Sequence, residues 1–202
     1  MIKAIHPKWD NCIDEDTTKL IIGTMPPQFV IDKDFDKCKF YYFYASNKNH
    51  FWDICKEINP DVKLETDQDC QKFLRDNHIG IIDVYDVAMR LNNDTTDKNL
   101  DGIKYNEDII KYLKKYPNIT KLYCTNGDNK GTKDILLNIL LKDYLVDFKY
   151  KKRVKREFIK LKGIDREIEV LWLYSPSGLY YNIHHNTINF KEIYNDLFSV
   201  NK

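Results

Sequence analysis

The sequence predicts an α/β protein with three layers, in which helices cover both faces of a central, mainly parallel four-stranded sheet. Two observations predict this class. Four short apolar runs have the length of buried strands, and segments with helical periodicity lie between them. Strands that alternate with helices favour parallel pairing, because each crossover helix packs back onto the sheet. The chain has 202 residues and no repeat or linker, so we expect one domain over residues 1–202.

The predicted strands are too short and too uniformly apolar to be surface helices. They are Lys19–Met25 (KLIIGTM), Gly80–Val87 (GIIDVYDV), Lys121–Asn126 (KLYCTN) and Glu169–Tyr174 (EVLWLY). Continuous apolar runs of this kind are typical of parallel strands that are buried on both faces.

Five further segments carry apolar residues at helical spacing. They are Asn49–Glu57, Asp67–Asn77, Asn106–Tyr116, Thr132–Leu145 and Asn189–Phe198. The third segment stops before Pro117, as expected, because proline disfavours the helical conformation in the residue that precedes it.

Composition places the chain among ordinary globular proteins, with 43% hydrophobic and 31% charged residues. No apolar run approaches the roughly 20 residues that a membrane helix needs, and the N-terminus lacks the apolar core of a signal peptide. We therefore expect a cytoplasmic protein. Its cysteines are widely spaced without a C-x-x-C pair, which predicts reduced, buried thiols and neither a metal site nor a cofactor: Cys12, Cys38, Cys55, Cys70 and Cys124.

The net charge of +1 gives no general affinity for polyanions, but one segment, Lys149–Arg156, is strongly basic. Two interpretations of it remain open at the level of sequence. It could be a solvated strand or loop, or it could be a local patch that contacts a polyanion such as DNA.

The residues that follow the predicted strands point to a site. In open parallel sheets, ligands bind beyond the carboxyl ends of the strands. Here those ends are polar or rich in glycine and proline: Gly23–Pro27, Asp83 with Asp86, Asn126–Asp128 and Ser175–Leu179. Their convergence predicts a crevice at this edge of the sheet.

Three side chains near this edge have a functional and a structural interpretation. Tyr44 lies in a loop, where its ring could stack on a planar ligand or belong to the core. Asn126 offers the donor and acceptor that match a nucleobase edge, but Asn-Gly is also a common turn. Leu179, followed by Tyr180 and Tyr181, could form an exposed apolar wedge or pack against the last helix.

Four short motifs occur in an order that resembles the uracil-DNA glycosylase superfamily, most closely its mismatch-specific and hypoxanthine-type branches. The motifs are Gly23-Thr24-Met25-Pro26, Asn49-His50-Phe51-Trp52, Asn126-Gly127 and Ser175-Pro176-Ser177-Gly178-Leu179. The resemblance covers most of the chain, from Lys19 to Asn182.

The resemblance implies a pocket for a base that is flipped out of DNA. Its lining would be Gly23, Thr24, Met25, Pro26, Tyr44 and Asn126, with Tyr44 stacked on the base and Asn126 bonded to its edge. The loop of Ser175, Pro176, Ser177, Gly178 and Leu179 would enter the minor groove. Leu179 would fill the gap that the flipped nucleotide leaves.

The sequence departs from the family pattern at two catalytic positions. Many members carry Asn or Asp two residues after the motif glycine to hold the attacking water, whereas this chain has Met25. Several members carry His in the last motif, where Tyr174 and Ser175 stand here. The catalytic candidates are therefore Asn49, which is equally suited to cap a helix, and behind it Asp83 and Asp86.

The resulting hypothesis is a DNA glycosylase that hydrolyses an N-glycosidic bond in double-stranded DNA, acting as a monomer without metal or cofactor. Uracil, hypoxanthine, mismatched thymine and a modified pyrimidine all remain open as the excised base. Two alternatives also stay open: a catalytically silent DNA-binding protein on the same fold, and a hydrolase of a small nucleotide or nucleoside. The last alternative has less support, because the sequence has no strong glycine-rich phosphate loop and a small substrate would give an exposed Leu179 tip no role.

Overall fold

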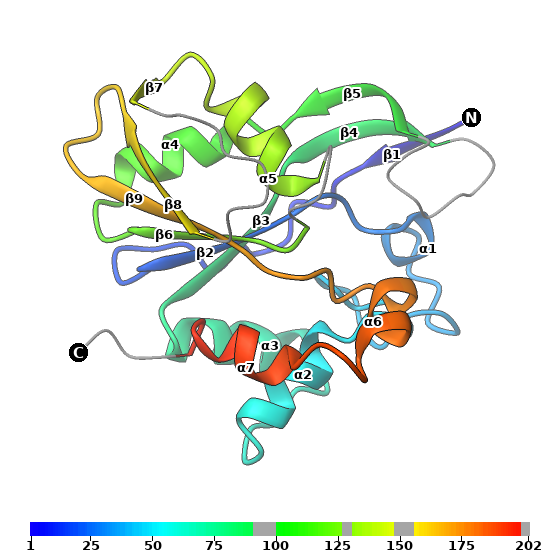
Figure 1. The fold of residues 1–202 in the computed structure, drawn as a ribbon. Coiled ribbons are helices and arrows are strands. Elements are labelled where there is room, and N and C mark those ends of the chain that lie inside the picture. The colour runs from blue at the N-terminus through cyan, green and yellow to red at the C-terminus, as the bar shows by residue number, and fades with distance from the viewer. Residues whose placement is uncertain (91–99, 127–130, 148–155, 199–202) are drawn as a thin grey trace.

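The computed structural model describes residues 1–90, 100–126, 131–147 and 156–198, and its centre is a six-stranded sheet (Figure 1). The strand order is β3–β2–β6–β9–β8–β7. The first four strands are parallel, and the last two are antiparallel to their neighbours. Their bounds are β2 Lys19–Gly23, β3 Ile79–Asp83, β6 Lys121–Cys124, β7 Leu145–Asp147, β8 Arg156–Leu161 and β9 Glu167–Trp172.

The prediction of a parallel sheet with helices is confirmed, but the prediction of four strands is wrong, because β8 and β7 extend the sheet. The outer strand β8 is buried on one face only. Glu157, Ile159 and Leu161 point inward, while Arg156, Phe158 and Lys160 are exposed. This alternation is the signature of a half-buried antiparallel strand, and a search for continuous apolar runs overlooks it.

The predicted strand Gly80–Val87 is two strands in two sheets. β3 ends at Asp83, and β4 (Tyr85–Arg90) joins a smaller antiparallel sheet with the order β1–β4–β5. The other strands of that sheet are β1 (Ile2–Ile5) and β5 (Leu100–Tyr105). At the junction, Asn106 donates from its side chain to the Asp83 carbonyl and from its backbone to the Val84 carbonyl. New partners therefore take over the backbone hydrogen bonds, and the chain changes sheet within one residue.

Helices cover both faces of the large sheet (Figure 1), with α4 (Asp108–Lys115) and α5 (Thr132–Ile135) on one side and α2 (Phe51–Ile58), α3 (Asp67–Asp76) and α7 (Phe190–Asn195) on the other. Two apolar clusters fill the layers. Within β2, Leu20 and Ile22 belong to one cluster and Ile21 to the other, as the strand alternation requires.

Two short helices, α1 (Gln28–Ile31) and α6 (Gly178–His184), complete the described elements. The predicted helix Thr132–Leu145 is shorter than expected, because α5 continues as a π-helical turn over Leu136–Leu140 and the chain then enters β7. None of the helices in the described ranges is long and apolar enough to cross a membrane.

Candidate active site at the strand ends

The turn that follows β2 is fastened to the β3–β4 junction through its carbonyl groups. Gly23 accepts from the Val84 N–H at 2.9 Å, and Thr24 accepts from the Tyr85 N–H at 3.2 Å. Pro26 accepts from the Arg90 guanidinium at 3.0 Å, and that side chain is fully buried. Met25 points into the core, so its side chain offers no polar group to a ligand. The turn that follows β2 is therefore held in place by three hydrogen bonds to its carbonyl groups.

Gly23 is the point where two predicted site residues meet. A methyl group at this position would collide with Asp83 Oδ1 and would lie 2.7 Å from the Tyr44 hydroxyl oxygen. Asp83 pairs with Gly23 in register at the ends of β3 and β2, and it is 4% exposed. Only glycine leaves room here for a carboxylate and a phenol side by side.

The carboxylate of Asp83 faces a histidine that the sequence analysis did not single out. His6 Nε2 lies 3.3 Å from Asp83 Oδ2, and both side chains are 6% exposed. His6 directly follows β1, and its backbone N–H donates to the Asp86 carbonyl at 2.9 Å. No sequence motif marks His6. Only the pairing of β1 with β4 brings it to the end of β3.

Asp86, the third catalytic candidate, lies within β4 and bonds to Lys8. The Lys8 ammonium donates to Asp86 Oδ1 at 2.5 Å, and the Lys8 backbone N–H donates to His6 Nδ1 at 3.1 Å. Lys8 has a positive φ of 55°, a conformation that needs support from its surroundings. Asp86 therefore supports the His6 loop, whereas Asp83 lies at the end of β3 beside Gly23.

Tyr44 connects the ends of β2 and β6. Its hydroxyl forms a hydrogen bond of 2.9 Å with Thr125 Oγ1, and one face of its ring stacks on Phe51 with centroids 4.6 Å apart. Its φ of 55° is unusual for a tyrosine and places the ring against the strand ends. Asn126 follows Thr125, is partly exposed, and accepts from the Lys133 N–H at 3.3 Å. Gly127 and Asp128 lie outside the described residues.

Asn49 lies just before the N-cap of α2, which is His50. Its side-chain oxygen accepts a local hydrogen bond from the N–H of Phe51, the first residue of the helix, at 2.9 Å. Its backbone pairs with Ser177, and the next residue, His50, donates to the Pro176 carbonyl at 2.9 Å. The two motifs that contain these residues are thus joined by backbone hydrogen bonds.

Gly178 makes this junction possible. A methyl group at this position would collide with the Lys48 carbonyl oxygen, so the two chain segments approach as closely as a glycine permits. Because Lys48 lies only a few residues after Tyr44, the segment that starts α6 is held against the loop that supplies the Tyr44 ring. Pro176 is buried in this junction, and Ser175 is partly exposed.

The predicted apolar tip is reduced to one residue of the predicted three. Leu179 lies in the first turn of α6, not in a loop, and is 75% exposed. Tyr181 stacks on His50 with centroids 4.1 Å apart, and Tyr180 stacks on Tyr174 at 5.9 Å. The tyrosines are therefore half-buried and fix the helix. One turn later, Ile183 is 63% exposed and extends the apolar face of Leu179.

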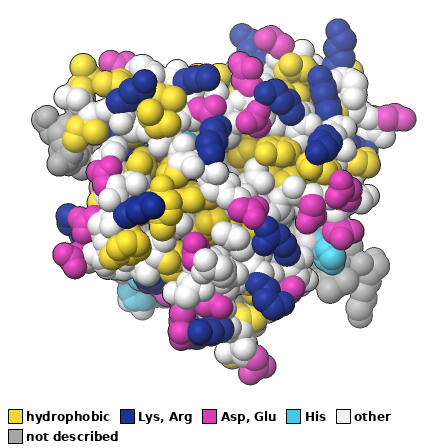
Figure 2. Space-filling view, turned by 180° about the vertical axis from the view of Figure 1, so that it is seen from behind, with side chains coloured by type: hydrophobic (Ala, Val, Ile, Leu, Met, Phe, Trp, Pro, Cys, Tyr) yellow, Lys and Arg dark blue, Asp and Glu magenta, His cyan; other side chains and the backbone are white. Residues whose placement is uncertain are grey.

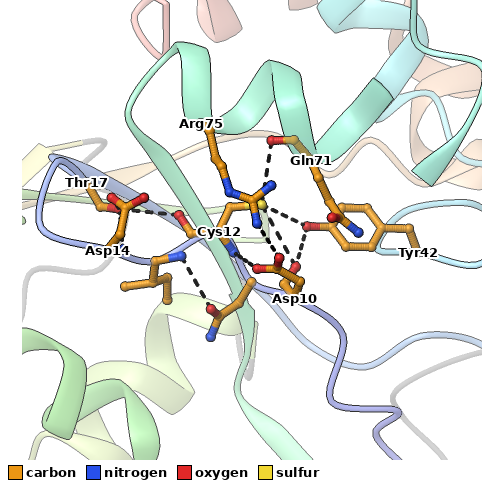
Figure 3. A network of polar contacts seen from close by, with 9 residues as sticks. Asp10, Cys12, Asp14, Thr17, Tyr42, Gln71 and Arg75 are labelled. Carbon is orange, nitrogen blue, oxygen red and sulfur yellow. Dashed lines mark hydrogen bonds and ion pairs between the residues drawn. The ribbon is translucent and has the colours of Figure 1, made fainter. Parts of the chain in front are cut away.

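A polar network anchors the chain between His6 and β2 (Figure 3). Arg75 of α3 forms an ion pair with Asp10, and Tyr42 donates to the Asp10 carbonyl at 2.5 Å. The Cys12 thiol lies 3.4 Å from the Tyr42 hydroxyl, and burial raises the pKa of this thiol. Because Tyr42 lies two residues before Tyr44, the network supports both the loop that follows His6 and the loop that carries Tyr44.

The other features of the surface add little to the strand-end site. A cavity of about 370 Å³ is lined by Glu57, Tyr181 and His185–Lys191, of which only Tyr181, from the predicted apolar tip, was singled out from the sequence. No cluster that could hold a metal ion occurs among the described residues. Figure 2 shows a face on which basic and acidic side chains are interspersed. In the basic segment Lys149–Arg156, all but Arg156 lie outside the described residues, and Arg156 forms an ion pair with Glu169 at 2.7 Å.

Comparisons with known proteins give a structural match. No family model matches the sequence, and no curated protein is significantly similar to it. A solved structure, the NMR structure of a candidate uracil DNA glycosylase from Methanosarcina acetivorans, matches with a TM-score of 0.55 and 18% sequence identity. The match covers 93% of this chain and 92% of that chain. At this identity it shows a shared fold, a mixed α/β architecture with a parallel-rich sheet.

Proposed function

We propose that this protein is a monofunctional DNA glycosylase, which flips an altered base out of double-stranded DNA and hydrolyses its N-glycosidic bond. Three observations support the proposal. The fold matches that of a candidate uracil DNA glycosylase over nearly the whole chain. Polar side chains converge on the Gly23 turn. An exposed leucine stands on a short helix that is bonded to the same loop region.

In the proposed mechanism, Asp83 orients a water molecule toward the anomeric carbon of the flipped nucleotide. The bond between sugar and base breaks with an oxocarbenium-like sugar, the base leaves with the electron pair, and water adds to the sugar. Asp83 accepts the proton that this water loses. Tyr44 stacks on the base, and Asn126 donates a hydrogen bond to its edge as negative charge builds there.

Asp83 replaces Asn49 as our first catalytic candidate. The Asn49 side-chain oxygen already accepts a hydrogen bond from the Phe51 N–H in a local turn at the start of α2. Asp83, by contrast, is a buried carboxylate whose neighbours are Tyr44 and His6. A carboxylate accepts hydrogen bonds at both oxygens, so Asp83 can serve as a general base toward a water molecule.

The observation that carries the proposal is the meeting of Asp83 and Tyr44 at Gly23. Three distant parts of the chain bring the Asp83 carboxylate and the Tyr44 phenol together beside Gly23. Leu179 lies on a helix that is held against the Tyr44 loop, so insertion of this side chain into DNA would occur beside these groups. Such a wedge offsets part of the few kcal/mol that unstacking a base costs.

The test is excision from a panel of duplexes, each of which holds one altered base: uracil, hypoxanthine, mismatched thymine or a modified pyrimidine. We expect alkali-labile abasic sites in at least one duplex and none in the matched normal duplex. Asp83→Asn protein serves as the control for contaminating enzymes. Activity equal in wild type and Asp83→Asn would contradict the proposed role of Asp83.

The same panel separates the two alternative functions. A silent DNA-binding protein would bind the duplexes with a steep dependence on salt and would leave no abasic sites. A nucleoside hydrolase would release the base from the free nucleoside at least as fast as from the duplex. The absence of both DNA binding and base release would contradict the proposal as a whole.

A further inference from the structure

We propose that His6 is a positioning residue for this reaction, which holds the Asp83 carboxylate in the orientation that aims it at the attacking water. This inference rests on the proposed function. It concerns a residue outside every motif of the sequence, because Asp83 follows His6 by 77 positions in the chain. Four features of the structure support it.

The first feature is the protonation pattern of the imidazole. His6 Nδ1 accepts a hydrogen bond from the Lys8 N–H at 3.1 Å, so this nitrogen carries no proton. The proton of the neutral ring must then be on Nε2, the nitrogen that faces Asp83. A backbone N–H thus selects the tautomer that can donate to the carboxylate, in the same way that an orienting partner fixes a catalytic histidine.

The second feature is the contact itself. His6 Nε2 lies 3.3 Å from Asp83 Oδ2, and this nitrogen has no well-aligned hydrogen-bond acceptor among the described residues. A long and poorly aligned contact adds little to the stability of the folded protein. It is, however, the geometry that catalytic pairs often have before substrate binds and tightens them.

The third feature is the packing around the ring. Trp9 and Phe43 each contact the imidazole with centroids 5.4 Å apart, and His6 is 6% exposed. An apolar side chain would fill such a seat at a smaller desolvation cost than an imidazole. The presence of a donor here is explained if the donor serves the carboxylate. Phe43 also directly precedes Tyr44, so the same loop packs against the His6 imidazole and supplies the Tyr44 side chain beside Gly23.

The fourth feature is the support behind His6. Lys8, whose N–H fixes the tautomer, is held by its ion pair with Asp86. Further along the same loop, Asp10 is held by Arg75 and Tyr42 (Figure 3). The loop is thus fastened on both sides, which limits the freedom of the imidazole. A series of contacts runs from Asp86 through Lys8 and His6 to Asp83. Asp86 therefore has a role that does not require contact with substrate.

The test compares His6→Gln with His6→Ala in single-turnover excision from the substrate duplex. Gln can place its amide N–H near the position of Nε2–H, whereas Ala has no donor. We expect His6→Ala to slow excision by about 10–10²-fold, the range for a misplaced catalytic group, with an unchanged dissociation constant for DNA. His6→Gln should recover most of the rate. Equal rates in the two variants, with both folded by thermal melting, would overturn the inference.

A second measurement does not depend on activity. Long-range ¹H–¹⁵N NMR of the imidazole should show a protonated Nε2 and an unprotonated Nδ1 in the wild type, and Asp83→Asn should shift the Nε2 signal. A proton on Nδ1, or an unchanged Nε2 signal in Asp83→Asn, would overturn the inference even if the enzyme excises bases. If the NMR result is as expected and no duplex is cleaved, the proposed function fails and the His6–Asp83 contact stands.

Discussion

The strand-end region around Gly23 and the exposed face of α6 differ in how their key residues relate to the core. Asp83 and His6 are buried. Asp83 ends a strand of the large sheet, His6 follows a strand of the small sheet, and the ion pair of Lys8 with Asp86 supports the His6 loop. Leu179 and Ile183 are exposed and contribute almost nothing to the packing of the fold. We therefore expect a change at Asp83 or His6 to act on stability as well as on the proposed chemistry, and a change at Leu179 or Ile183 to act on the proposed DNA contact alone.

The strongest test of the strand-end region around Gly23 is Asp83→Asn, which keeps the shape of the side chain and removes its negative charge. We expect excision to slow by about 10²–10⁴-fold, the usual contribution of a general base. Binding of the duplex should persist, because the substitution changes neither Leu179 nor the turn that follows β2. Single-turnover rates and DNA titrations measure the two quantities. A variant that keeps the wild-type rate would transfer the catalytic role to another group.

Gly178→Ala attacks the junction between the two regions. The added methyl group would collide with the Lys48 carbonyl oxygen, which belongs to the backbone and cannot rotate away. We expect a loss of about 1–3 kcal/mol in the free energy of unfolding, as is typical of overpacking, together with slower excision. Denaturant unfolding measures the first effect. Gly163→Ala is the matched control, since no atom lies within 4 Å of a methyl group at Gly163, although its positive φ alone brings some strain.

Leu179→Ala tests the exposed region. Because this side chain is 75% exposed, the melting temperature should not change. Excision from a fully paired duplex should slow by about tenfold, since the wedge no longer offsets the unstacking cost. Ile183→Ala, on the same face of α6, is the control for general loss of apolar surface. An equal loss from a duplex and from single-stranded DNA would argue against a wedge.

Tyr44→Phe separates stacking from hydrogen bonding beside Gly23. The phenylalanine keeps the ring that contacts Phe51 and loses the hydrogen bond to Thr125. We expect the variant to lose about 1 kcal/mol of stability and to keep its excision rate. Tyr44→Ala should lose both stability and excision rate, because it removes the ring as well as the hydroxyl. If Tyr44→Phe is as slow as Tyr44→Ala, the hydroxyl contacts the substrate directly.

The buried layers beneath the site predict a weak dependence of stability on high pH. Burial raises the pKa of the Cys55 and Cys124 thiols above the ordinary value of 9.0. Above that pH these thiols ionise in the unfolded chain but stay protonated in the folded chain, so the unfolded state binds fewer protons. The free energy of unfolding should therefore fall as pH rises above about 9. Replacing both cysteines by alanine should reduce this slope in denaturant titrations.

The sequence was informative where the physical signal is local. The apolar runs of β2, β3, β6 and β9 predicted the parallel centre of the sheet, and each predicted helix corresponds to a helical segment of the structure. The strand-end rule placed Gly23 and Asp83 at one edge, where they do lie together. It could not exclude Asp86, because the division of Gly80–Val87 between two sheets carries no glycine or proline signal.

What the sequence determined by itself was therefore the sheet centre, five of the helical segments and the polar character of the strand ends, since periodicity and turn chemistry act over a few residues. Tertiary structure alone decided three things: the meeting of His6 with Asp83, the burial of Tyr180 and Tyr181 beside an exposed Leu179, and the antiparallel strands β7 and β8. Each depends on partners distant in the chain. A contact between remote residues leaves no mark in the local pattern, because the free energy that favours it comes from packing and hydrogen bonds that exist only in the folded protein.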